Sequence, residues 1–311
     1  LKNLIIKKLM ISIIFLLIIL HGAFSLSLKR LSWTSRMDDT WKWNNYCINY
    51  VKNTNVDNKK AVLLIHGFGS SCYHWRCNIL NLPDEYDVYA FDLLGFGKSS
   101  KPDENYDLNL WCDQTNDFIE NVIQKDTIII GNSLGGSIAL NSSKNKKVNG
   151  VVLLNSYLRF KNKPNLKVPK FVIKLITRFY FNFIRRENKI SDTLHVLYPE
   201  NPEKVTQCLI DSITEPTNDP NALKVLTNII ENIICSQKDD SQEILCNFKK
   251  PLFLIWGLQD KWINKSMADK IIELHPHTET QFINAGHCPQ DEVPELVNDL
   301  ISKFLKKNFT N

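Results

Sequence analysis

The sequence lacks the features of several protein classes. Its eight cysteines include no Cys-x-x-Cys pair and are too sparse for a disulfide scaffold of 311 residues, so no zinc site is indicated. Whether the cysteines pair depends on an oxidising or a reducing compartment, and both alternatives stay open. The apolar run Leu9–Leu20 has twelve residues, fewer than the about 20 that cross a bilayer.

Acidic residues are missing from the first 37 positions, which hold six basic residues. Three lysines precede Leu9–Leu20, and Ala23-Phe24-Ser25 then offers a small-x-small cleavage site. The acid-free, serine-containing stretch that follows is typical of a transit peptide. We therefore expect residues 1–37 to be a leader that enters the secretory route and reaches a plastid by bipartite targeting, with a signal anchor as the alternative.

The rest of the chain lacks an excess of charge of either sign, because it carries 32 basic and 33 acidic residues. Binding to a phosphate backbone needs a dense basic face, so nucleic acid is excluded as a partner. The 43% content of hydrophobic residues excludes a disordered chain and suffices for a large core.

Short apolar runs alternate with segments of helical length after the leader. This alternation predicts an α/β fold with a mostly parallel sheet flanked by helices. The expected strands are Ala61–Ile65, Asp87–Phe91, Thr127–Ile130, Val148–Leu154, Pro251–Trp256 and Thr280–Ile283. Between Tyr157 and Cys246 helical spacing dominates, which indicates a helical cap insertion. The predicted divisions are the core in 38–157 and 246–311 and the cap in 158–245.

Within the cap, Val172–Ile184 and Asn221–Ile234 have amphipathic patterns, and both are expected to pack as a lid over the core. The first segment combines aromatic with basic residues. A solvated basic face is the preferred interpretation of this pattern, and transient contact with a membrane surface is the alternative.

The run Gly131-Asn132-Ser133-Leu134-Gly135 follows a predicted strand and opens a predicted helix. In this context Gly-x-Ser-x-Gly is a nucleophile elbow, a sharp turn that holds the serine in a strained conformation with its hydroxyl exposed. The flanking glycines are expected to remove side chains that would collide. Ser133 is therefore the predicted nucleophile.

A serine hydroxyl needs a base, and elbow enzymes follow the serine with an acid and then a histidine. Asp260 and His287 occur in this order, each just after a predicted strand, where the sites of α/β sheets gather. Asp92 is interpreted as shaping its loop and Asp291 as a charge at a helix N-terminus. The rival position for the acid, after Val148–Leu154, holds Asn155.

A tetrahedral oxyanion needs two N–H donors that are already in place. The backbone of Leu134, directly after the serine, is expected to supply one, and the backbone of Phe68, in the glycine-rich turn after Ala61–Ile65, the other. His66 is interpreted as a structural residue that orients this turn.

These residues resemble those of the α/β-hydrolase family over nearly everything after about Trp41. The narrower resemblance is to pheophytinase-like hydrolases of plastids and cyanobacteria, which cleave or are presumed to cleave carboxylic esters of lipophilic molecules. It is carried by four runs: Leu64–Gly69 with His74-Trp75-Arg76, Ala90–Ser99, Gly131–Gly136, and Gly286–Glu292. The position after Asp260 departs from many relatives, because Lys261 stands where they have proline.

The sequence thus predicts a serine hydrolase, independent of cofactors and metals, that cleaves a small lipophilic ester such as a chlorophyll-type phytyl ester through an acyl-enzyme. Epoxide hydrolases and haloalkane dehalogenases of this fold use aspartate where Ser133 stands, and are excluded. Three alternatives remain: a carbon–carbon bond hydrolase, a lipid acyltransferase, and a ligand-binding homologue without activity. The oligomeric state is not indicated.

Overall fold

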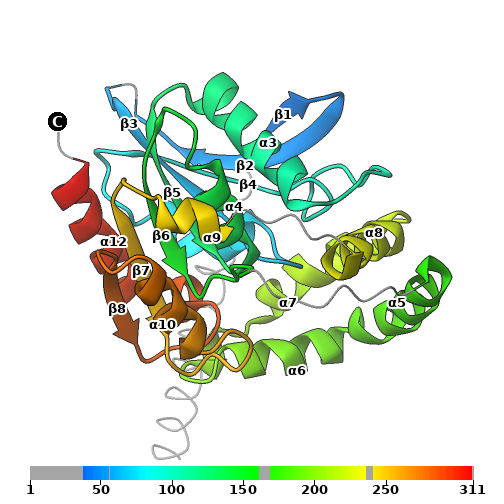
Figure 1. Cartoon of the computed structure of the whole chain (residues 1–311). Coiled ribbons are helices and arrows are strands. Elements are labelled where there is room, and N and C mark those ends of the chain that lie inside the picture. Colours follow the sequence, from blue (N-terminus) through cyan, green and yellow to red (C-terminus); the bar gives the residue numbers. More distant parts are fainter. Residues whose placement is uncertain (1–37, 56, 161–168, 236–240, 310–311) are drawn as a thin grey trace, which may run out of the picture. The chain divides into compact units, whose positions relative to one another are not determined.

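The computed structural model describes residues 38–55, 57–160, 169–235 and 241–309, so the predicted leader lies outside the described residues. Within them the chain forms an eight-stranded sheet of order β1-β2-β4-β3-β5-β6-β7-β8 (Figure 1). The neighbours from β4 to β8 pair in parallel, and β2 pairs antiparallel with β4. The strands are β1 (Asp38–Trp43), β2 (Tyr46–Asn53), β3 (Lys60–Ile65), β4 (Asp87–Phe91), β5 (Asp126–Asn132), β6 (Val148–Leu154), β7 (Leu252–Gly257) and β8 (Glu279–Ile283).

The six strands predicted from apolar runs are all present, as β3 to β8, and the predicted α/β fold with a mostly parallel sheet is confirmed. The strands β1 and β2 were not predicted. They lie at the sheet edge, where outward-facing polar residues interrupt the apolar pattern. Asn44 and Asn45, with φ of 48° and 68°, form the two-residue turn between them. An Asn-Asn pair with left-handed backbone is a hairpin signal that could have revealed both strands.

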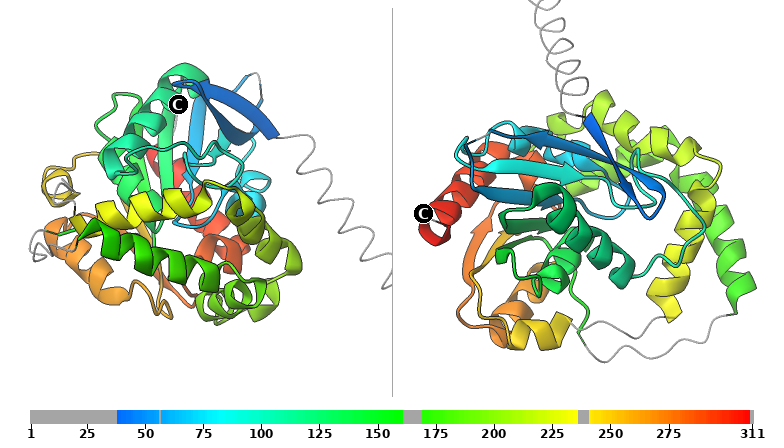
Figure 2. Two further views of the ribbon diagram at one scale, coloured as in Figure 1. Left: turned by 90° about the vertical axis from the view of Figure 1, so that its right-hand side faces the viewer. Right: turned by 90° about the horizontal axis from the view of Figure 1, so that it is seen from above.

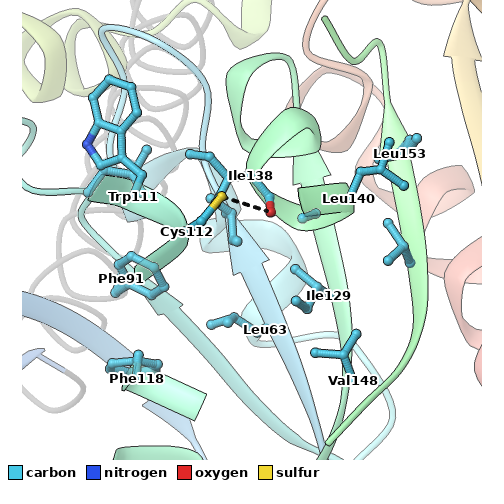
Figure 3. Packing of buried hydrophobic residues seen from close by; sticks show 14 of the residues in the cluster. Leu63, Phe91, Trp111, Cys112, Phe118, Ile129, Ile138, Leu140, Val148 and Leu153 are labelled. Carbon is cyan, nitrogen blue, oxygen red and sulfur yellow. Dashed lines mark hydrogen bonds between the residues drawn. The ribbon is translucent and has the colours of Figure 1, made fainter. Parts of the chain in front are cut away.

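The central strands are buried on both faces because helices cover each side of the sheet. On one face lie α3 (Leu108–Phe118), α4 (Leu134–Ser142), α9 (Ser241–Cys246) and α10 (Lys265–Leu274). Figure 3 shows this core: Leu63 of β3 and Ile129 of β5 face Ile138 of α4, and Trp111 of α3 closes one end.

The other face of the sheet packs on α2 (Arg76–Ile79) and α12 (Pro294–Asn308), with α11 (Pro289–Glu292) beside them. The ring of Phe253 on β7 stacks 5.4 Å from that of Phe304 on α12. Short turns complete the core at Cys72–Trp75 and Ile119–Ile123. With both faces covered, the carboxyl ends of the parallel strands are left as the place for a site.

Between β6 and β7 the described residues contain helices and no strand. They are α5 (Lys170–Ile184), α6 (Glu187–Leu197), α7 (Gln207–Thr214) and α8 (Ala222–Cys235), followed by α9 on the sheet, with short turns at Pro202–Lys204 and Glu215–Asn218. Helices α5 and α8 run side by side in both views of Figure 2. None of the helices in the described parts of the chain is both long and apolar enough to cross a bilayer.

Candidate active site

The turn between β5 and α4 consists of one residue, Ser133, with φ of 54° and ψ of −116°. For a residue other than glycine this backbone conformation costs about 1–3 kcal/mol in conformational strain. Such strain is typical of functional sites. The turn also needs its glycines. A Cβ on Gly131 would lie 2.2 Å from the carbonyl oxygen of Gly135, and one on Gly135 would lie 2.2 Å from that of Ile65. The expectation that side chains would collide here is confirmed.

Asp260 and His287 follow β7 and β8 and meet at the carboxyl edge of the sheet. The Nδ1 of His287 lies 2.6 Å from Oδ2 of Asp260, and both side chains are buried. The same Oδ2 accepts a hydrogen bond of 2.8 Å from Nδ2 of Asn155. The other oxygen, Oδ1, accepts bonds of 2.7 and 3.0 Å from the backbone N–H groups of Trp262 and Ile263. Asp260 therefore acts as an acceptor to four donors.

These contacts decide the charge of Asp260. Burial alone would raise its pKa, but the hydrogen bond and charge of His287 and the two backbone N–H groups outweigh burial and lower the pKa below its ordinary value. An ionised Asp260 accepts a hydrogen bond from the Nδ1–H group of His287, so that Nε2 of a neutral imidazole is left as an acceptor. The pair can thus present a base at Nε2.

The loop of His287 lies beside the serine turn. Asn132, directly before Ser133, donates from Nδ2 to the carbonyl oxygen of His287 at 2.9 Å. The ring of Trp262 lies 5.5 Å from that of His287, and Trp262 lines the same cavity as Ser133. The structure therefore brings the three residues predicted as nucleophile, acid and base to one end of the sheet.

The two predicted oxyanion donors also border this cavity. Phe68 and Leu134 line it together with Ser133, and Leu134 is the first residue of α4. A Cβ on Gly67 would lie 3.1 Å from Cβ of Ser133, so the turn that carries Phe68 abuts the serine. Both backbone segments therefore lie next to Ser133.

His66 and Asp92 hold loop backbone, in agreement with the roles expected from the sequence. His66 accepts a bond of 3.0 Å at Nε2 from the N–H of Leu93, and burial lowers its pKa, which keeps the ring neutral. Asp92 accepts from the N–H of Cys72 at 2.7 Å and of Lys98 at 2.8 Å. Neither side chain has the partners of a catalytic base or acid.

The cavity over Ser133 has a volume of about 430 Å³, which is the size of a small-molecule site. Aromatic and aliphatic side chains from the core and from α8 make most of its wall, and a few polar groups interrupt it. Its lining includes Tyr106, Leu108, Trp111, Tyr157, Ile229, Trp262 and Ile263. Among the residues that the structure describes, no group of three His, Cys, Asp or Glu side chains is arranged to hold a metal ion.

Asp291 lies in the first turn of α11, at a helix N-terminus as the sequence suggested, and it has a further role that the sequence did not suggest. Its carboxylate is fully buried and paired with Arg76, at 3.0 Å from Nη1 to Oδ2 and 2.9 Å from Nη2 to Oδ1. The hydroxyl of Tyr198 donates to Oδ2 at 2.7 Å. Because these partners are 215 and 93 residues away in the chain, no local pattern could have revealed the cluster.

A second carboxylate, Glu292, ties the loop of His287 to the residues after α6. It accepts bonds from the N–H groups of Gly286, Glu200 and Asn201 at 2.5, 2.7 and 3.2 Å. In addition, the N–H of His287 donates to the carbonyl oxygen of Leu197 at 3.0 Å. The position of His287 therefore depends on the segment Leu197–Asn201.

Replacing Arg76 with methionine is expected to lower the free energy of unfolding by about 3–5 kcal/mol, because it leaves the carboxylate of Asp291 buried without its cation. Urea denaturation measures the loss. Lys303→Met removes one partner of the exposed pair with Asp299 and should cost less than about 1 kcal/mol. Adding Asp291→Asn to Arg76→Met should recover part of the loss. If the Arg76→Met variant were as stable as the parent, the ion pair between Arg76 and Asp291 would not stabilise the fold.

Comparison with known proteins finds similarity to alpha/beta hydrolases in both sequence and structure. A family model described as the alpha/beta hydrolase fold matches residues 60–294. Chloroplastic pheophytinase of Arabidopsis thaliana is 28% identical over 79% of this chain, and the match spans 61% of that protein, less than two thirds of its length. The uncharacterised hydrolase YugF of Bacillus subtilis (strain 168) is 26% identical over 80% of this chain and 90% of its own. The crystal structure of a putative lipase from Acinetobacter baumannii AYE superposes with a TM-score of 0.73 at 23% identity, covering 92% of this chain and 96% of that one.

Proposed function

Since this chain belongs to the α/β-hydrolase fold family and is thus an enzyme of the hydrolase class, we propose that it is a serine hydrolase that cleaves the carboxylic ester of a lipophilic molecule. The observation that carries the proposal is the strained Ser133 at the wall of an apolar cavity, beside the paired Asp260 and His287. Strain, an oriented base and two candidate N–H donors are what acyl transfer requires.

In the proposed reaction, Nε2 of His287 takes the hydroxyl proton while Oγ of Ser133 attacks the ester carbonyl carbon. The N–H groups of Phe68 and Leu134 hold the negative oxygen that forms, and Asp260 stabilises the imidazolium. His287 then passes the proton to the leaving alcohol, which departs and leaves an acyl-enzyme. Water, deprotonated by His287, attacks this ester and releases the carboxylic acid and Ser133.

The proposed substrate is lipophilic because the cavity offers aromatic and aliphatic surface and few polar groups. The relative from Arabidopsis thaliana is named a pheophytinase. A chlorophyll-type phytyl ester is therefore the first candidate to test, and long-chain esters of simpler acids are the second.

A fluorophosphonate probe tests the proposal, because the oxygen of an activated serine attacks its phosphorus, displaces fluoride and forms a phosphonate ester. We expect one adduct, on Ser133, that requires the folded protein and is absent from the heat-denatured sample. Peptide mapping locates the adduct. No adduct on a folded protein would favour a ligand-binding homologue instead.

A substrate panel separates the remaining alternatives. Faster turnover of a dienoic diketone than of any ester would indicate a carbon–carbon bond hydrolase. Transfer of the acyl group to an added alcohol, in preference to water, would indicate an acyltransferase. We expect long-chain and phytyl esters to have the highest kcat/KM, with the free acid as product.

The carboxylate of Asp260 is expected to add no ionisation of its own to the acid side of the pH–rate profile. The pKa of Asp260 lies below its ordinary value, so its charge persists as the pH falls through the range in which an exposed aspartate is neutralised. The acid limb of a plot of log kcat/KM against pH is therefore expected to have a slope of one. A slope of two would mean that the carboxylate of Asp260 is neutralised within the same pH range in which activity is lost.

A further inference from the structure

Helix α5 exposes an unusual amount of apolar surface. Of the twelve large apolar side chains that are exposed in the described residues, six lie on this one helix, with 49% to 77% of their surface accessible. They are Phe171, Leu175, Ile176, Phe179, Tyr180 and Phe183, here called the α5 patch. Each of them exposes on the order of 100 Å². Their summed exposed apolar area therefore exceeds the few hundred Å² that a soluble monomer usually leaves exposed in one place.

Within the described residues, the α5 patch is not the face through which α5 packs on the rest of the protein. Helix α5 already packs through Ile173, Thr177 and Phe181, which are buried at intervals of four residues, and Phe181 meets α8 at Ala222 and Leu226. The α5 patch occupies the remaining circumference, where a surface helix normally presents polar side chains. The sequence-based preference for a solvated basic face is therefore incomplete, because the same face exposes aromatic rings.

The charges that α5 itself carries beside the α5 patch have one sign, and Glu231 of α8 pairs with only one of them, Lys170. Residues 170–186 contain five basic residues and no acid, and their side chains are Lys170, Lys174, Arg178, Arg185 and Arg186. The guanidinium of Arg186 lies 5.9 Å from the ring of Phe183, which keeps charge and aromatic surface together. A second copy of the chain, packed symmetrically on this face, would place these like charges opposite one another. Aromatic and aliphatic groups ringed by cations suit the boundary between headgroups and acyl chains of an anionic bilayer.

An apolar cavity leads inward from α5. It has a volume of about 150 Å³ and lies between Phe181 and Ile184 of α5, Leu226 of α8, and Phe68 of the core. Phe68 and Ile229 line both this cavity and the one over Ser133. The two cavities therefore adjoin at Phe68 and Ile229, between the inner side of α5 and the serine.

We propose that the α5 patch docks this protein on anionic membrane surfaces and that lipophilic esters pass from the bilayer along the α5 cavity to Ser133. Docking does not depend on catalysis. The route to Ser133 rests on the proposed hydrolase function, so the two parts are tested separately.

Docking is tested with the full chain carrying Ser133→Ala, mixed with vesicles of phosphatidylcholine alone or of phosphatidylcholine and phosphatidylglycerol in equal amounts. Because the run Leu9–Leu20 could enter a bilayer by itself, hydrogen exchange resolved by peptide is the main measurement. We expect exchange in the peptides of α5 to slow with the anionic vesicles and to change little with the neutral ones. Unchanged exchange in α5 on protein that floats with the vesicles would overturn the proposal.

Two double variants separate apolar from ionic contributions. Phe171→Ser with Phe179→Ser should abolish the protection of α5, and Lys174→Glu with Arg178→Glu should lower affinity for anionic vesicles by about tenfold or more. The matched control on α12, Leu296→Ser with Lys306→Glu, changes an exposed apolar and an exposed basic residue and should have no effect. Equal loss in the control, or a dimer in gel filtration that α5 variants convert to monomer, would contradict membrane docking.

The route is tested with the active protein. The α5 variants should cleave a short-chain, water-soluble ester at the parental rate and lose most turnover of a long-chain ester embedded in anionic vesicles. Loss on both substrates would contradict a role in substrate delivery. If the parent cleaves neither ester, the proposed function has failed, and the exchange experiment still decides docking.

Discussion

Replacing Ser133 with alanine is expected to lower kcat for ester hydrolysis by about 10⁶-fold, the size of loss that follows when a triad enzyme is deprived of its nucleophile. The fold should persist, because alanine keeps the Cβ that meets Gly67 and removes only Oγ. The free energy of unfolding is therefore expected to stay within about 1 kcal/mol of the parent, above or below it, because the backbone strain at this position is unchanged.

The matched control is Ser137→Ala, one turn further along α4. Ser137 lines the same cavity, but its hydroxyl donates to the carbonyl oxygen of Tyr157. This variant should keep kcat within about tenfold of the parent, since no bond to the substrate is made or broken there. If Ser133→Ala retained more than a small fraction of the rate while Ser137→Ala lost it, the nucleophile would have to be reassigned.

The second large effect is expected for Asp260→Asn, at about 10⁴-fold in kcat. All four partners of Asp260 are donors: His287 and Asn155 on Oδ2, Trp262 and Ile263 on Oδ1. An amide has to direct its NH₂ group toward one of these pairs, so two donors would face a donor in either orientation. The imidazole would then lose the bond that fixes its tautomer, or the loop at Trp262 would shift.

Kinetics with a water-soluble ester measure this loss, and circular dichroism checks the fold. Asn155→Ala provides the comparison, because it removes one donor to Asp260 and leaves the carboxylate in place. We expect it to cost about tenfold to 100-fold, less than the loss of the acid itself. An Asp260→Asn enzyme with the parental rate would mean that another group orients His287.

The sequence was sufficient where a local pattern determines the structure. The apolar runs of β3 to β7 are fully buried for most of their length, so they could be recognised without a partner, and the glycines at 131 and 135 mark a turn that few other residues permit. The edge hairpin escaped prediction because β1 is buried on one side only, which interrupts its apolar pattern.

Contacts between distant segments could not be predicted. Arg76 and Asp291 are 215 residues apart, and nothing near either one indicates a buried pair. Asn155 was considered only as the residue that occupies a rival position for the acid, whereas it braces the acid itself. The exposure of the α5 patch could not be foreseen either, because an apolar helix is expected to be buried until its neighbours are known.

The bonds from the loop of His287 to Leu197, Glu200 and Asn201 have a consequence for exchanging modules between hydrolases. These residues lie in the predicted cap by chain order, yet they support the loop that carries His287. A chimera that grafts a foreign cap onto this chain would remove the carbonyl that holds His287 and the N–H groups that hold Glu292. To change specificity by recombination, the crossover points have to leave Leu197–Asn201 with the recipient core and replace only the helices on either side.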